Sequence, residues 1–166
     1  MTAPVVVFAV GNPSRGDDAL GPLLAARFAD FLEETGREGE FEILEDFQLQ
    51  VEHALDLQGR ALALFVDAGT GTPAPYGFKA IRPANGYGHT THALEPEAVL
   101  QVFRQTEGVE PPPAYVLCVR GESFELGEDL TPQATRHLEA ALELMQELAR
   151  GPSVGAWSRI AEKNQR

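Results

Sequence analysis

Two stretches of the chain are apolar at every position, and each gives way to a polar turn. Residues 4–10 are rich in β-branched side chains, and residues 61–66 are apolar throughout. Runs of this kind are typical of central strands in a sheet that is covered on both faces. The first run breaks at Gly11 and the second is closed by Asp67. We therefore expect two buried strands, both of which lead toward acidic residues.

A helical pattern follows each turn or loop. From Asp18 to Glu34 the apolar residues fall on one stripe with offsets of three and four, which predicts a helix that ends before Gly36. A short helix is expected over residues 51–57. Another should begin near Pro96, and a long one, ending near residue 150, should begin at the N-cap and proline pair Thr131-Pro132.

Three further strands are predicted at residues 41–45, 77–82 and 115–119. Only about ten residues separate the strand at 61–66 from that at 77–82, too few for a usual parallel crossover, so we expect this pair to run antiparallel. The predicted fold class is α/β: an open twisted, mostly parallel five-stranded sheet with helices on both faces, a phosphorylase/hydrolase-like three-layer arrangement. Residues 1–150 are expected to form a single domain, and residues 151–166 a frayed tail.

Composition and charge exclude several classes of function. The net charge of -12, with only 13 Lys and Arg residues, argues against nucleic-acid binding. No apolar run approaches the roughly 20 residues of a membrane span, and the first residues lack the layout of a signal peptide. The lone Cys118 cannot form an internal disulfide, which favours the cytoplasm; we expect it to be a small buried hydrophobic residue. A monomer is the default expectation.

Acids and imidazoles are predicted to meet at the carboxyl edge of the sheet, where open α/β folds bind ligands. The first strand leads to Asp17 and Asp18, another ends on Asp67, and the loop after the fourth strand contains His89 and His92. Two carboxylates and an imidazole suit a divalent metal such as nickel or zinc. Ordinary roles compete: Asp17 is expected to cap its helix, Asp18 could stabilise the helix dipole, and His92 could be a plain loop residue.

Other active-site templates fit poorly. The turn at residues 11–16 has neither the glycine spacing of a dinucleotide fingerprint nor the lysine of a phosphate-binding loop. A Ser14–His92–Asp67 triad is compatible with the order of residues, but nothing supports it. His53 and His137 have no partner in the sequence and are expected to be solvated.

The motifs together resemble the hydrogenase maturation endopeptidases, which process the large subunit of NiFe hydrogenases. The resemblance runs from about residue 5 to residue 148, in order. A loop after the second strand, residues 46–50, also resembles that family. The matching motifs are Gly11-Asn12 with Asp17-Asp18 and Gly21, Val66-Asp67-Ala68, Thr91-His92, and Glu122-Ser123 with Leu130-Thr131-Pro132.

The resemblance implies a function and a site. It implies an endopeptidase that removes the C-terminal extension of a nickel-loaded NiFe hydrogenase large-subunit precursor. Nickel, carried by that precursor, would be bound by Asp18, Asp67 and His92; another divalent metal could occupy the site in isolation. Asp18 stands where the family often has the longer Glu. We assign a general-base or hydrolytic role to Asp67, and substrate binding to residues that belong to the resembling segments, Gln48, Leu49 and Thr91.

Two other functions compete with this prediction. A non-catalytic metal-sensing assembly module on the same fold would dock a metalloprotein without cutting it. An ordinary α/β binder of small molecules or nucleotides is disfavoured by the missing phosphate loop.

Overall fold

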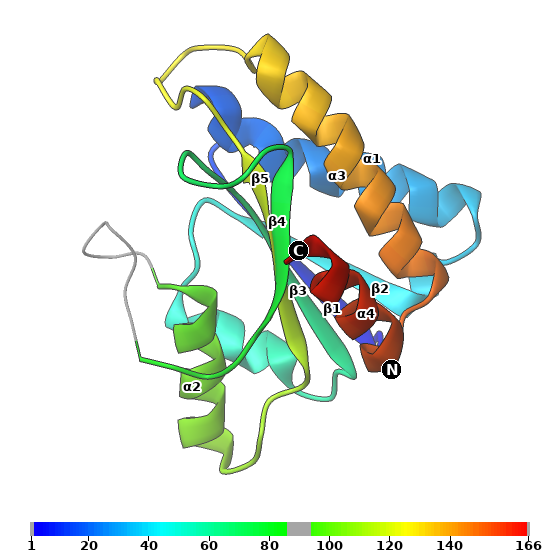
Figure 1. Ribbon diagram of the computed structural model, residues 1–166. Helices are drawn as coiled ribbons and strands as arrows, with labels where there is room; N and C mark the ends of the chain where they lie inside the picture. Colours follow the sequence, from blue (N-terminus) through cyan, green and yellow to red (C-terminus); the bar gives the residue numbers. More distant parts are fainter. Residues whose placement is uncertain (1, 86–93, 166) are drawn as a thin grey trace.

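The computed structural model describes residues 2–85 and 94–165, which contain one five-stranded sheet with helices on both of its faces (Figure 1). The strand order is β2-β1-β3-β5-β4. The strands are β1 (Val5–Val10), β2 (Phe41–Asp46), β3 (Leu62–Gly69), β4 (Tyr76–Ile81) and β5 (Ala114–Arg120).

The pairing of the strands confirms the predicted mixture of directions. β1 lies between β2 and β3 and is parallel to both, and β3 is parallel to β5. Only β4 is antiparallel, against β5 at the edge of the sheet. The strand predicted at 61–66 continues further than expected, because the pairing of Asp67 with Cys118 and of Ala68 with Val119 extends the ladder to Gly69. Asp67 therefore lies within a strand rather than in a turn.

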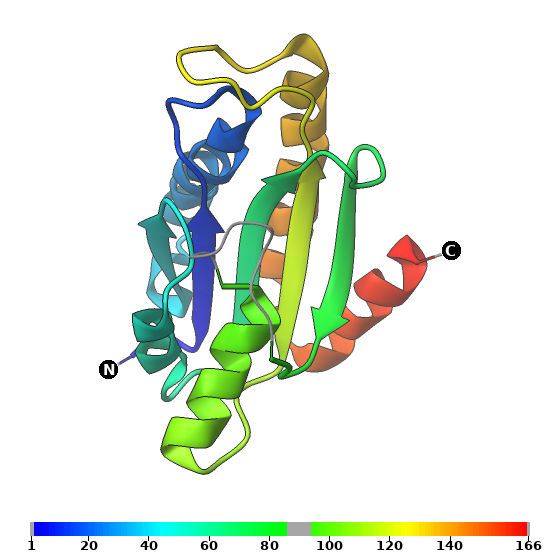
Figure 2. The ribbon, with the colours of Figure 1, turned by 90° about the vertical axis from the view of Figure 1, so that its left-hand side faces the viewer.

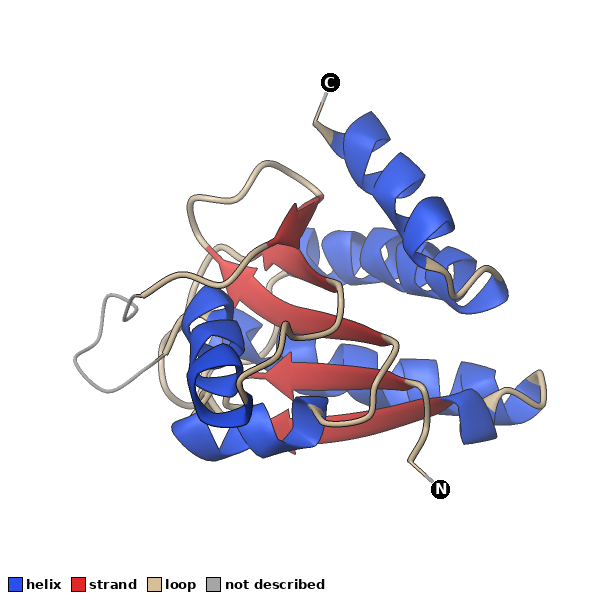
Figure 3. Ribbon diagram, turned by 90° about the horizontal axis from the view of Figure 1, so that it is seen from below, coloured by secondary structure: helices blue, strands red, loops and turns tan. Residues whose placement is uncertain are grey.

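The helices divide between the two faces of the sheet (Figures 2 and 3). α1 (Leu20–Glu34), α3 (Pro132–Arg150) and α4 (Val154–Asn164) pack with one apolar cluster, and α2 (Pro96–Glu107) packs with the other. The predicted helix at 51–57 is present as a 3₁₀ segment on the α2 face. Two shorter 3₁₀ segments lie at Gly16–Ala19 and Glu38–Glu40.

The central strand β1 supplies both cores. Val5 and Val7 belong to the cluster under α1 and α3, while Val6 and Phe8 belong to the cluster under α2, in keeping with the alternation of side chains along a strand. All six residues of β1 are buried, as its uninterrupted apolar sequence predicts.

The prediction that residues 151–166 form a frayed tail is wrong. Residues 154–164 form α4, whose Trp157 has no exposed surface. The Trp157 indole N–H donates to the Leu148 carbonyl at 3.0 Å, and its ring meets Tyr115 edge-on with 5.4 Å between centroids. The Tyr115 hydroxyl in turn lies 2.6 Å from Ser158 Oγ. One large aromatic residue thus fixes a helix whose sequence shows only a short apolar stripe. Within the described part of the chain, no helix is both long and apolar enough to cross a membrane.

Candidate functional site

The turn between β1 and α1 is packed so tightly that it requires glycine at two positions. A Cβ on Gly11 would lie 2.1 Å from the Asp18 carbonyl oxygen, and a Cβ on Gly21 would lie 2.2 Å from the Val10 carbonyl oxygen. Real Cβ atoms do not approach backbone oxygens so closely, so larger residues would force the strand and helix apart. These glycines let the chain double back directly above the end of β1, and this places Asp18 beside the strand.

Asp18 is oriented by the same turn. Its Oδ2 accepts a hydrogen bond from the Asn12 backbone N–H at 2.7 Å, and the side chain is half-buried. Burial raises the pKa of Asp18 above its ordinary value, although the Asn12 N–H and the charge of Arg15 act in the opposite direction. In the described residues no hydrogen bond reaches Oδ1 of Asp18, so one carboxylate oxygen is fixed and the other is available.

The Asp67 carboxylate, on β3, is also held by one backbone N–H. Its Oδ1 accepts from the Ala68 backbone N–H at 2.7 Å. The pKa of Asp67 is raised to about 7: burial is the largest cause, the negative charges of Asp18 and Glu95 add to it, and the Ala68 N–H acts in the opposite direction. A carboxyl group with this pKa exchanges its proton near neutral pH, which suits either a general base or a metal ligand that binds by losing a proton.

Asp18 and Asp67 are thus brought to one edge of the sheet, as the sequence predicts. β1 and β3 are parallel neighbours with Ala9 opposite Val66, so their carboxyl ends meet, and the charge of Asp18 acts on the pKa of Asp67. The third predicted ligand, His92, and the nearby His89 lie outside the described residues. Over residues 2–85 and 94–165, no group of three or more His, Cys, Asp or Glu side chains is arranged to hold a metal ion. The described part of the site is a pair of carboxylates.

Asp17 does not cap its own helix, and here the prediction is wrong. Its side chain is fully buried and forms no cap hydrogen bond at the start of the 3₁₀ segment. Instead its Oδ2 accepts from the backbone N–H groups of Glu122 and Ser123 at 2.6 and 3.2 Å and from the Thr131 hydroxyl at 2.8 Å, while its Oδ1 accepts from the Thr131 N–H at 2.7 Å. Burial would raise the pKa of Asp17, but these hydrogen bonds outweigh it and the pKa is lowered.

These bonds give the last sequence motif a structural role. The loop from β5 to α3 is joined to the first turn by Asp17 and by backbone hydrogen bonds from Gly16 N–H to the Glu128 carbonyl at 3.1 Å and from Gly127 N–H to the Ser14 carbonyl at 2.7 Å. The residues of the motif at 122–123 and 130–132 therefore hold the turn that presents Asp18. Thr131 also caps α3 by accepting from the Ala134 N–H.

The three residues predicted to bind substrate differ from one another in their exposure. Gln48 is exposed after β2, where a substrate could reach it. The Leu49 side chain is 5% exposed and packs in the core under α2, so it offers no surface to a substrate. Thr91 lies outside the described residues.

Cys118 and two histidines also differ from expectation. Cys118 is half-buried rather than a core hydrophobic residue, and its Sγ lies 2.9 Å from Thr72 Oγ1. Burial raises the pKa of its thiol, which disfavours the nucleophilic thiolate. His53 Nδ1 accepts from the Gln50 N–H at 2.9 Å, and His137 Nδ1 lies 2.9 Å from the Arg120 carbonyl oxygen. Both histidines therefore have structural partners.

Glu95 is a residue that sequence reasoning did not select. It immediately precedes α2, is exposed, and contributes to the raised pKa of Asp67. The only signal in the sequence was an acid directly before the first proline of a helix that follows the histidine loop.

Comparisons with known proteins point in one direction. No protein-family model matches the chain, and no curated protein matches it. The NiFe hydrogenase maturation protease HycI from Thermococcus kodakarensis has a similar structure, with a TM-score of 0.66, 24% identity, and coverage of 90% of this chain and 94% of that one. The hydrogenase maturating endopeptidase HybD from E. coli matches with a TM-score of 0.60 and 25% identity, over 84% and 88% of the two chains. An endopeptidase from Escherichia coli matches with a TM-score of 0.62 and 25% identity, over 89% and 93%.

The sequence motifs and the structural neighbours agree. The neighbours have a similar overall fold, and in this chain the first two motifs fall where the sheet brings Asp18 and Asp67 together. This chain has the fold of the NiFe hydrogenase maturation proteases.

Proposed function

We propose that this protein is an endopeptidase that removes the C-terminal extension of a nickel-loaded NiFe hydrogenase large-subunit precursor. The observation that carries the proposal is the pair formed by Asp18, in the turn after β1, and Asp67, near the end of the adjacent strand β3, in a fold shared with proteins named as hydrogenase maturation proteases. The non-catalytic assembly module is not favoured, because the structural neighbours are named as proteases.

The geometry of the two carboxylates suits recognition of a metal that arrives with the substrate. Each of Asp18 and Asp67 has one oxygen held by a backbone N–H, at 2.7 Å in both cases. Fixing one oxygen restrains the rotation of the carboxylate, so the other oxygen can bind a cation with little further loss of entropy. We infer that these oxygens, together with His92, complete the coordination of nickel bound in the precursor.

The raised pKa of Asp67 fits this sequence of events. At pH values below about 7 the side chain is largely protonated, and it becomes a ligand when a nearby cation replaces the proton. With a precursor that lacks nickel, Asp67 would keep its proton in this pH range. We also assign to the Asp67 carboxylate the activation of the water that attacks the scissile carbonyl. The lone cysteine fits action in the reducing cytoplasm, and we propose that the protein acts as a monomer.

The test uses purified nickel-loaded precursor and follows the shortening of the large subunit. Asp67→Asn and His92→Ala are expected to reduce the processing rate at least 100-fold, roughly the loss expected when a metal contact or base is removed. Asp18→Ala should have a similar effect. Asp30→Asn, at an exposed position of α1, is the control and should process the precursor at the wild-type rate. Normal processing by both Asp67→Asn and His92→Ala would refute the proposal.

A further inference from the structure

Among the described residues, no helix covers one face of the sheet over β5 and β4. Figure 2 shows α2 in front of β1 and β3, whereas β5 and β4 have no described helix on that side. Val116 and Cys118 of β5, which face this side, are half-buried, while Leu117 and Val119 on the other face are fully buried. Because largely parallel sheets are normally covered on both faces, the open area marks a surface that can receive a ligand.

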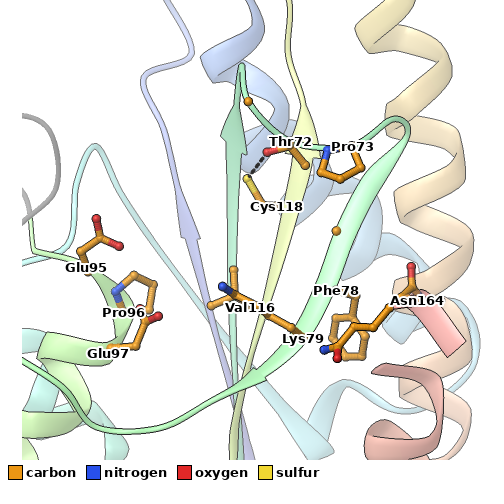
Figure 4. Close-up of a pocket in the computed structure, with 13 residues that line it drawn as sticks. Thr72, Pro73, Phe78, Lys79, Glu95, Pro96, Glu97, Val116, Cys118 and Asn164 are labelled. Atoms are coloured by element: carbon orange, nitrogen blue, oxygen red, sulfur yellow. Dashed lines mark hydrogen bonds between the residues drawn. The ribbon is translucent and has the colours of Figure 1, made fainter. Parts of the chain in front are cut away.

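A cleft of about 710 Å³ lies over this face (Figure 4). This volume is within the range of roughly 300–1,000 Å³ that is usual for ligand sites. The cleft is lined by residues of β4 and β5, by the loop before β4, by the start of α2 and by the C-terminal end of α4. The lining includes Thr72, Gly77, Lys79, Cys118, Glu95 and Asn164.

The cleft is continuous with the carboxylate pair. Asp67 is the register partner of Cys118, which in turn is the partner of Gly77. Side chains of register partners project from the same face of a sheet, so Asp67 lies on the face that carries the cleft. The charge of Asp67 also acts on the pKa of the Cys118 thiol, as expected for near neighbours. A substrate cut beside Asp67 therefore has a path across Cys118 and onto β4.

The charges in the cleft are separated. Lys79 of β4 is the one cation among the described residues that line it, and no described residue forms an ion pair with it. In Figure 4 the Lys79 side chain extends from β4 toward Val116, while Glu95 and Glu97 are on the side of α2. In a chain with a net charge of -12, an unpaired lysine in a cleft is a specific point of attraction for an acidic group.

We propose that this cleft binds the C-terminal extension of the precursor as an extended peptide, and that Lys79 contacts an acidic side chain of it. This inference rests on the proposed function. Lys79 lies on β4, two strands away from the β3 residue Asp67, and is two residues beyond Gly77, which is level with Asp67 in the sheet. The Cα atoms of Lys79 and Asp67 are therefore about 12 Å apart. An extended peptide advances roughly 3.3 Å per residue. The acidic residue is therefore the third or fourth after the scissile bond.

Gly77 offers a way to fill the cleft without disturbing the fold. A Cβ at this position would have only Thr72 Cγ2 nearby, at an ordinary contact distance of 3.9 Å, and its φ is not in the left-handed region. A side chain at Gly77 would project into the cleft, and a β-branched residue is well suited to a strand. Gly77→Val should therefore fill part of the cleft, and Gly77→Phe should fill more of it. Ala80→Val, at an exposed position on the opposite face of β4, is the matched control.

The experiment measures processing of the nickel-loaded large-subunit precursor from the same organism, with melting temperatures recorded for every variant. The expected result is that Gly77→Phe raises KM at least tenfold, Gly77→Val less, and Ala80→Val less than twofold. If wild type cuts and folded Gly77→Phe cuts equally well, the cleft assignment is overturned while the proposed function stands. If wild type does not cut, the proposed function fails and the inference fails with it. A Gly77→Phe effect that arises only from loss of a dimer would make a second copy the occupant and would also overturn the inference.

The role of Lys79 is tested by exchanging charges. Lys79→Glu should raise KM about tenfold, and Lys79→Arg should stay within threefold of wild type. Replacing the acidic residue at the third or fourth position of the extension by Lys should restore cutting by Lys79→Glu and impair cutting by wild type. A structural role for Lys79 would not give this reciprocal rescue, so its absence would overturn the assignment of Lys79.

Discussion

Removing the Asp17 carboxylate should strongly destabilise the protein. Asp17 is fully buried and accepts four hydrogen bonds from three residues of the loop before α3. Hydrogen bonds to a charged group contribute about 1.5–3 kcal/mol each in isolation, but those sharing one carboxylate are coupled. We therefore expect Asp17→Ala to lower the free energy of unfolding by about 4 kcal/mol, since it leaves several buried donors unpaired.

Asp17→Asn should be milder. Its remaining oxygen can replace Oδ2, which accepts three of the bonds, whereas its amide group would face the Thr131 N–H. The clash between the Asn amide and the Thr131 N–H, both of which are donors, and the loss of the negative charge should together lower the free energy of unfolding by about 2 kcal/mol. For a chain of this size, 1 kcal/mol corresponds to roughly 2–4 °C in melting temperature. The expected decreases are thus about 4–8 °C for Asn and about 8–16 °C for Ala.

The assay is urea and thermal unfolding followed by circular dichroism between pH 3 and pH 8. Because the pKa of Asp17 is lowered in the folded state from its ordinary value of 3.8, its stabilisation is present above that pH and is lost as the pH falls through the lower, folded-state pKa. The gap between wild type and Asp17→Asn should therefore close in acid. Glu139→Ala, which removes an exposed ion pair with Arg27, is the control and should stay within about 0.5 kcal/mol of wild type. An Asp17→Ala variant within about 1 kcal/mol of wild type at pH 7 would refute the reasoning.

Three further changes test other parts of the structure. Asp67→Asn should melt at a higher temperature than wild type at pH 8 but not at pH 4, because raising the pKa of Asp67 from 3.8 to about 7 on folding makes the wild type lose stability as the pH rises from about 3.8 to about 7; equal melting curves at pH 8 would contradict this. Trp157→Ala should cost about 3–5 kcal/mol in urea unfolding, and a loss below 1 kcal/mol would mean that α4 is not docked. Gly21→Ala should greatly reduce the yield of folded protein, whereas Gly39→Ala, with no atom near its added Cβ, should not.

Much of the fold could be predicted from local patterns. The buried runs at β1 and β3 are apolar at every position, so they require a sheet with two covered faces. The short connection before β4 sets its antiparallel direction. The Thr131-Pro132 pair begins α3 as expected, with the Thr131 side chain acting as the cap. In each case the information lies within a few residues of the element it determines.

The errors concern contacts between distant parts of the chain. Asp17 bonds to residues 105 to 114 positions away, so a single sequence suggests only a local cap. α4 has few apolar residues, and it docks because Trp157 meets Tyr115 and the end of α3, which only the folded sheet brings together. Leu49 lies in a segment that resembles a substrate loop, yet its side chain completes the core. The pairing of Asp18 with Asp67, in contrast, was predictable, because parallel neighbours place their carboxyl ends side by side.

The most direct test of the central claim is the intact mass of the large-subunit precursor after incubation with this protein, with and without nickel loading. The account predicts a single loss of mass, equal to one C-terminal peptide, in the nickel-loaded sample with wild type, and no loss with Asp67→Asn or in the nickel-free sample. Equal cutting of loaded and nickel-free precursor, or undiminished cutting by Asp67→Asn, would contradict recognition of nickel by the Asp18 and Asp67 pair.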